Sequence, residues 1–130
     1  MRPTRRGDRG QATVELALVL PLVALLVLLV LQAGLVLRDQ LLVAHAAREA
    51  ARAAAVADGD RGAAARNGAV RSGSLDPAHM VVRTTSREGS EAVVVRVDYE
   101  STTEVPLVGL LLPDVSLKAE AVMRVEAPAG

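Results

Sequence analysis

The sequence predicts an α+β protein in which a long N-terminal transmembrane helix continues into an alanine-rich outer helix packed on a small antiparallel sheet of about three strands. Three observations predict this class. Residues 16–37 carry no charge and are mostly leucine and valine. Residues 38–58 are rich in strong helix formers and contain no glycine or proline. Residues 92–100 and 117–126 alternate apolar with polar side chains, as strands with one buried face do.

Composition limits the functions open to this chain. The 15 basic and 15 acidic residues balance, so no overall electrostatic field favours nucleic acid or an acidic substrate. Cysteine is absent, which excludes disulfides and thiolate metal sites. Tyr99 is the sole aromatic residue, so a folded core has to be built from valine, leucine and alanine. We therefore expect a small domain with no nucleic-acid partner.

Charge is distributed unevenly, and residues 1–10 form a basic leader. The leader holds four arginines against one aspartate, whereas the arginines that follow the apolar run are spread out and partly offset by acidic residues. Positively charged flanks of membrane helices tend to stay in the cytoplasm. The leader is therefore predicted to be cytoplasmic, and residues 38–130 are predicted to form an extracytoplasmic α+β domain.

Residues 11–37 are predicted to be the transmembrane segment, in contact with membrane lipid. The charge-free part, residues 16–37, contains 11 leucines and 5 valines. As a helix it would span roughly 33 Å at about 1.5 Å per residue, enough to cross a hydrocarbon core of about 30 Å. Pro21 lies near the start of this run, where a mild kink is expected rather than a break.

A cleaved secretory signal peptide is the alternative interpretation of this N-terminus. Residues 44–46, Ala-His-Ala, imitate a small-x-small cleavage site downstream of a basic leader. The apolar run, however, exceeds the roughly 7 to 15 residues of a signal-peptide core. Glu15 also stands where such a signal would have no acidic residue. Both features favour a membrane anchor over a secretory signal peptide.

Residues 38–58 are expected to continue the membrane helix as one rod, which the glycines of residues 58–62 interrupt. Alanines recur every four positions along this rod and form smooth ridges that let another helix or sheet approach closely. Ala47, Ala51 and Ala54 are the expected packing face. The alternative is that alanine is present only because it is a good helix former.

The remaining elements follow from turn residues and from period-two alternation. Their predicted order is a helix at 63–71, a loop at 72–79, and strands at 80–87, 92–100 and 117–126, with a hairpin turn at 88–91 between the first two strands. An apolar segment at 105–114, closed by two prolines, is too short to span a membrane. It is expected to be partly buried, and the alternative is an exposed patch that touches lipid or a partner.

No catalytic pattern emerges. His45 and His79 are far apart and have no companion ligands, so no metal site is expected. Residues 66–73 contain glycine but lack the spacing and the terminal Lys-Ser/Thr pair of a phosphate loop. The serines stand in turn-like contexts without a nucleophile elbow. The prediction is a protein that is not an enzyme and has no cofactor.

The junction of leader and apolar run resembles a known processing signal. A glycine, four residues and then a glutamate precede the apolar helix, and the matching positions are Gly10 and Glu15. This resembles the signature of type IV prepilins, in which a membrane peptidase cuts after the glycine. Together with the outer helix and the terminal strand, the sequence resembles the TadE-like family, pseudopilin-type components of the bacterial tight-adherence (Flp) pilus system. The likeness is strongest over the first 57 residues.

This resemblance implies a single-pass structural protein of the bacterial inner membrane that assembles with other tight-adherence pilus components and with itself. It also implies a prepilin-type peptidase that cuts between Gly10 and Gln11, and a new Gln11 amine that pairs with Glu15. The alternative for Glu15 is a charge at the membrane edge whose partner is Arg9 or a lipid headgroup. Cleaved and uncut forms, and places in the fibre or in the assembly platform, all stay open. The competing prediction is a signal-anchored or secreted adhesion domain without a pilus role.

Overall fold

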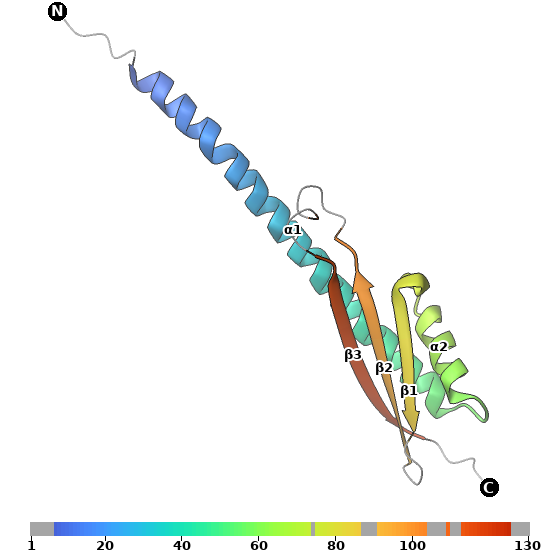
Figure 1. Ribbon diagram of the computed structural model, residues 1–130. Coiled ribbons are helices and arrows are strands. Elements are labelled where there is room, and N and C mark those ends of the chain that lie inside the picture. Colours follow the sequence, from blue (N-terminus) through green and yellow to red (C-terminus); the bar gives the residue numbers. More distant parts are fainter. Residues whose placement is uncertain (1–6, 74, 87–90, 104–108, 110–112, 126–130) are drawn as a thin grey trace, which may run out of the picture.

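The computed structural model describes residues 7–73, 75–86, 91–103, 109 and 113–125, and the structural statements below concern these residues. A long helix carries a second helix and a three-stranded sheet at its C-terminal end, while its N-terminal half projects away from them (Figure 1). The elements are α1 (Gly7–Ala55), α2 (Arg61–Arg71), a 3₁₀ turn η1 (Pro77–His79), and strands β1 (Met80–Ser86), β2 (Ala92–Ser101) and β3 (Val115–Arg124). The predicted α+β class and the N-terminal membrane-type helix are confirmed.

Helix α1 is one element of 49 residues that includes both the apolar run and the alanine-rich segment. Pro21 lies inside it without ending it. The helix stops at Ala55 rather than at the predicted residue 58. Residues 56–60 instead form the turn that leads into α2. Asp60 ends that turn as the N-cap of α2, and its Oδ1 accepts a hydrogen bond of 3.0 Å from the Ala63 backbone N–H. Such a bond satisfies a donor that a helix N-terminus otherwise leaves unpaired.

The segment predicted as a loop at 72–79 contains more structure than expected. Gly73 follows α2 with a φ of 74°, a left-handed conformation that glycine adopts without strain. The side chain of Asp76 then accepts a hydrogen bond of 2.9 Å from the backbone N–H of Ala78 and caps η1. The Asp-Pro pair at positions 76 and 77 is a helix-start signal that the sequence interpretation did not use.

The sheet has the order β1-β2-β3 and is antiparallel throughout. The central strand pairs Val95 with Thr84 on one side and with Ala121 on the other. Val93, Val95 and Val97 of β2 are fully buried, so the predicted inward face of this strand is confirmed. The hairpin turn predicted between β1 and β2 lies largely outside the described residues, as does most of the apolar segment 105–114.

The core lies between the outer half of α1, residues 38–55, and the inner face of the sheet, with α2 closing one side. Its members are small aliphatic residues: Val43, Ala46, Ala47, Ala50, Ala51, Ala54, Ala55, Ala65, Ala69, Val93, Val95, Val97 and Leu117. Alanines on the helix let its backbone lie close to the valines of the sheet, so a core without large aromatic side chains still fills its space.

Candidate functional site

The apolar half of α1, residues 16–37, exposes most of its large side chains. Leu22, for example, is 68% exposed. The most apolar window of the helix has a mean hydropathy of 3.0, and none of it is buried inside the protein. Among the described residues this is the one helix long and apolar enough to cross a membrane. Since a core helix of a soluble protein would be covered, these features fit a membrane anchor.

One strip of this half is less exposed than the rest. Within residues 10–37 the side chains that are not exposed are Leu25, Leu28, Gln32 and Val36. Gln32 is only 5% exposed, and its Oε1 has no hydrogen-bond partner. We call these four residues the membrane strip. It is the continuation of the α1 face that carries Val43 into the core, because positions 36 and 43 are seven residues apart.

Polar contacts join the sheet to α1 immediately after the apolar run. The hydroxyl of Ser101, at the end of β2, donates a hydrogen bond of 2.7 Å to Oδ2 of Asp39. Nε2 of Gln40 donates to the backbone carbonyl of Lys118 in β3 at 3.2 Å. Ser101 is buried, and Asp39 and Gln40 are half-buried. These bonds fix the end of the sheet that lies nearest the membrane segment against a defined turn of the helix.

The predicted processing residues lie at the other end of α1. Gly10 is already helical, because α1 begins at Gly7, and a Cβ added at Gly10 would meet no atom within 4 Å. Gln11 and Glu15 are exposed. Glu15 has no ion-pair partner among the residues whose side chains are described. The structure thus leaves these residues accessible.

Ala47, Ala51 and Ala54 all lie in the core. Ala51, like Ala54, has no exposed surface. The outer half of α1 contacts α2, β2 and β3, so it is covered on several sides at once. Any larger side chain on this face would therefore have to displace a neighbouring element.

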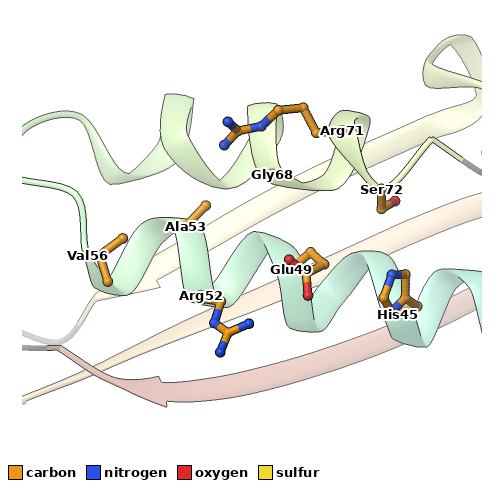
Figure 2. Close-up of a pocket in the computed structure, with 8 residues that line it drawn as sticks. All are labelled: His45, Glu49, Arg52, Ala53, Val56, Gly68, Arg71 and Ser72. Carbon is orange, nitrogen blue, oxygen red and sulfur yellow. The ribbon is translucent and has the colours of Figure 1, made fainter.

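A groove lies between α1 and α2, with a volume of about 410 Å³ (Figure 2). Its lining mixes polar and apolar side chains from both helices: His45, Glu49, Arg52, Ala53, Val56, Gly68, Arg71 and Ser72. At Gly68 the two helices nearly touch, because an added Cβ would stand 2.8 Å from the Ala53 Cβ and 2.9 Å from the Glu49 carbonyl oxygen. This groove is a surface feature of a close helix crossing.

Among the described residues no group of three or more His, Asp or Glu side chains is placed to hold a metal ion. The outer face of the sheet carries the ion pairs Arg83–Asp98 and Arg96–Glu120, the latter at 2.7 Å. Exposed pairs of this kind contribute little to stability and are typical of a solvated surface.

Sequence reasoning missed three of these features. Gly68 stood in a glycine-bearing segment, but its close contact depends on how α2 crosses α1. Gln32 was visible as the one polar side chain of the apolar run, yet only the structure shows that it is covered. The bond between Asp39 and Ser101 joins positions 62 residues apart and had no local signal.

A comparison with protein-family models found a match. Residues 10–52 match the family model described as TadE-like protein, which is about a third of the chain. The matched range holds Gly10, Glu15, the apolar half of α1 and most of its outer half, and it ends before α2 and the sheet. Neither the curated proteins nor the solved structures gave a match.

Proposed function

Residues 10–52 are similar to the TadE-like family, and from this similarity we propose that the chain is a non-catalytic, pseudopilin-like component of a tight-adherence pilus system. The family is a pilus-associated structural family, and this likeness supports a pilus association for the chain. The finer proposal is that α1 anchors it in the bacterial inner membrane while the α+β domain stands outside and contacts other pilus components or further copies of the chain.

The observation that carries this proposal is the change of surroundings along the single helix α1. Its apolar half is exposed and suited to lipid, whereas its outer half is buried under a sheet. An unbroken helix transmits position and orientation from membrane to domain, because no linker absorbs movement between them. A structural subunit held at the membrane needs this property.

The proposed domain boundaries and orientation follow from charge. Residues 1–10 would lie in the cytoplasm, 11–37 in the membrane and 38–130 outside. The basic leader supports this orientation through the tendency of positive charge to remain inside. A protease added to intact spheroplasts should digest the domain, and it should leave an epitope fused to the leader untouched.

Processing between Gly10 and Gln11 by a prepilin-type peptidase is part of the proposal. Gly10 lies in the first turn of α1, where few intrahelical hydrogen bonds have to be broken for the backbone to become extended. Gly10 and Gln11 are both exposed, so a membrane peptidase would have access to the bond between them.

The rival function is a signal-anchored or secreted adhesion domain. Its secreted form is disfavoured by the position of the cleavage site that it requires. A cut after Ala46 would fall inside the core portion of α1 and would remove Val43 and Ala46 from the hydrophobic cluster. Intact-mass analysis of the protein from its native host separates the two functions. A mature chain that begins at Gln11 supports the pilin-type role, and one that begins at Ala47 would overturn it.

Full-length protein would leave both functions open, because an uncut member of the family and a signal-anchored adhesion domain would both keep the leader. In that case the pilus role is tested by co-purification with tight-adherence components from detergent-solubilised membranes. The control is a variant truncated after Leu37, which keeps the anchor and lacks the domain. Recovery of the same partners with both proteins would show that the domain has no part in pilus assembly.

A further inference from the structure

Strand β3 is an edge strand, because it pairs with β2 on one side and comes last in the order β1-β2-β3. The backbone N–H of Val125 donates to the carbonyl of Glu91, which directly precedes β2. In an antiparallel pair, residues that bond to the partner strand alternate with residues that do not. The odd-numbered residues of β3 therefore bond to β2, and the even-numbered ones point their backbone N–H and C=O groups outward.

The outer half of this edge is open. One outward carbonyl, that of Lys118, already accepts a hydrogen bond from Nε2 of Gln40 in α1. Further along the strand, the outward groups belong to Glu120, Val122 and Arg124, and no described residue pairs with them. A row of unpaired backbone groups of this kind is a template on which a further strand can form.

A groove of about 370 Å³ lies beside the open edge, between α1 and β3. Three arginines line it against one glutamate, and all three are exposed. None of the three forms an ion pair with another described side chain. Figure 2 shows the guanidinium of Arg52 turned away from α2. The groove therefore carries positive charge that the domain does not neutralise. Its lining is Arg48, Glu49, Arg52, Ala55, Val56, Met123 and Arg124.

We propose that the edge and the groove together bind an acidic, extended segment of a partner protein, which joins the sheet as a fourth strand beside β3. Backbone groups of Glu120 and Val122 give such a segment its hydrogen bonds, and alternate side chains of the segment face the groove. Arg48 and Arg52 are one helical turn apart, about 6 Å along α1. Side chains on one face of a strand repeat at about 6.6–6.8 Å, so carboxylates at alternate positions match the two arginines.

The position of the groove favours a protein over lipid as the source of these carboxylates. With the proposed membrane placement, Arg48 lies eleven residues beyond residue 37, a rise of about 16 Å along α1. The headgroup layer on one side of a bilayer is only about 5–8 Å thick. The inference concerns the domain surface and does not depend on a pilus role.

The charge requirement is tested with the full chain in a non-ionic detergent and a fluorescent, end-blocked peptide of alternating glutamate and threonine. The test variant combines Arg48→Gln with Arg52→Gln. The control combines Arg66→Gln with Arg71→Gln, which removes the same charge from exposed positions on α2 that do not line this groove. Because hydrogen bonds to charged groups contribute about 1.5–3 kcal/mol each, the test variant should bind the peptide at least about tenfold more weakly than the wild type. The control should bind as the wild type does, and equal binding by the two variants would overturn the proposal.

The strand pairing is tested separately at Val122, which is 61% exposed. Val122→Pro removes an outward N–H, a change that edge strands tolerate, and should abolish peptide binding. Val122→Thr keeps the N–H and should bind normally. If Val122→Pro unfolds at a lower temperature than Val122→Thr, hydrogen exchange of the wild-type protein decides instead.

In that measurement, the peptide should slow exchange at the backbone amides of positions 120, 122 and 124. Peptide binding without slower exchange at these positions would show attraction of an anion to the arginines alone and would overturn the proposal. Slower exchange in concentrated protein without peptide would assign the edge to a second copy of the chain, which also overturns it.

Discussion

At the scale of single residues, Gly68 is the position where one added carbon should matter most. The Cβ of an alanine there would stand 2.8 Å from the Ala53 Cβ and 2.9 Å from the backbone oxygen of Glu49. Backbone atoms cannot rotate away, so α2 would have to shift from α1. We expect Gly68→Ala to lower stability, because overpacking costs roughly 1–3 kcal/mol and exceeds the gain in helix propensity of about 1 kcal/mol. Thermal unfolding of the full chain in detergent measures this.

The matched control for this variant is Asn67→Ala, one residue earlier in α2. Asn67 is exposed, and the substitution raises helix propensity without adding bulk at the crossing. It should leave the unfolding temperature unchanged or raise it. If Gly68→Ala were as stable as Asn67→Ala, the close approach of the two helices would not constrain residue size.

Ala51 tests the packing face of α1 in the same way. It has no exposed surface and lies in the core. Ala51→Leu should overpack the helix and the sheet and destabilise the domain by roughly 1–3 kcal/mol. Ala51→Ser should be nearly silent, because its hydroxyl can bond to the carbonyl four residues earlier. Equal unfolding midpoints for the two variants in urea would show that the face is not closely packed.

Gly10 is the residue on which the proposed processing depends. A peptidase that cuts after Gly10 must hold the backbone closely, and a residue without a side chain allows this. Because an added Cβ meets no atom within 4 Å, Gly10→Val should leave the fold and membrane insertion intact while it blocks maturation. N-terminal sequencing of protein from the native host reads the outcome. Normal trimming of this variant would remove the prepilin-type peptidase from the proposal.

At the scale of elements, the hydrogen bond from Ser101 to Asp39 ties β2 to α1 where the membrane segment ends. Ser101→Ala would remove the donor and leave the half-buried carboxylate to water. Hydrogen bonds to charged groups contribute about 1.5–3 kcal/mol, and we expect the lower end because Asp39 is partly exposed. Urea unfolding should show this loss, and hydrogen exchange should become faster at the backbone amides of positions 101 and 118.

Ser116→Ala on β3 is the control, since Ser116 is exposed and pairs with Glu100 of the same sheet. It should change neither stability nor exchange. A Ser101→Ala protein that matches this control would mean that the sheet is held on α1 by its apolar core alone.

The elements themselves were largely predictable from the sequence. A charge-free run followed by alanine-rich residues predicted one long helix, and α1 is one helix. Alternation predicted the inward faces of β2 and β3, because period-two patterns report directly on a sheet that is covered on one side. The ends of the elements were predicted less accurately. Strand β3 begins at Val115 rather than at residue 117, because Val115 pairs with Ser101. No local pattern reveals that contact.

The candidate sites also differ in whether a local sequence pattern could predict them. Alanine spacing indicated which side of α1 could be approached closely, but it left open whether anything would approach. The covered state of Gln32 and the near-contact at Gly68 depend on how distant segments cross, so single-sequence reasoning had no access to them. Gly10, Gln11 and Glu15 are matters of processing and assembly, and a folded single chain does not test them.

At the scale of the whole molecule, α1 places the α+β domain and the residues near Gly10 at opposite ends of one rod (Figure 1). With the proposed membrane placement, the two ends would meet different environments. The outer end is closed by its own sheet and second helix. The inner end has Glu15 exposed, with no ion-pair partner among the described side chains. Assembly of several molecules is thus expected to involve the inner end as well as the domain surface.

We expect Glu15 to contribute to this assembly. A carboxylate at the edge of a bilayer loses part of its hydration unless a cation replaces it. Cleavage after Gly10 would free the amine of Gln11, and this cation can pair with Glu15 of the same molecule or of a neighbour. Opposite charges attract more strongly in such a low-dielectric setting than in water. A pair between neighbours would favour lateral association, whereas a lipid headgroup or Arg9 as partner would not.

Glu15→Ala should therefore still insert, and still be cut if the wild type is cut, but associate less with itself and with pilus partners. Glu15→Gln keeps the size and polarity of the side chain and removes only the charge, so it separates ion pairing from packing. Crosslinking in the membrane at matched expression compares both variants with the wild type. A loss in both assigns association to the charge, and a loss in Glu15→Ala alone assigns it to side-chain packing or neutral hydrogen bonding. Wild-type crosslinking in both would reduce Glu15 to a marker of the membrane boundary.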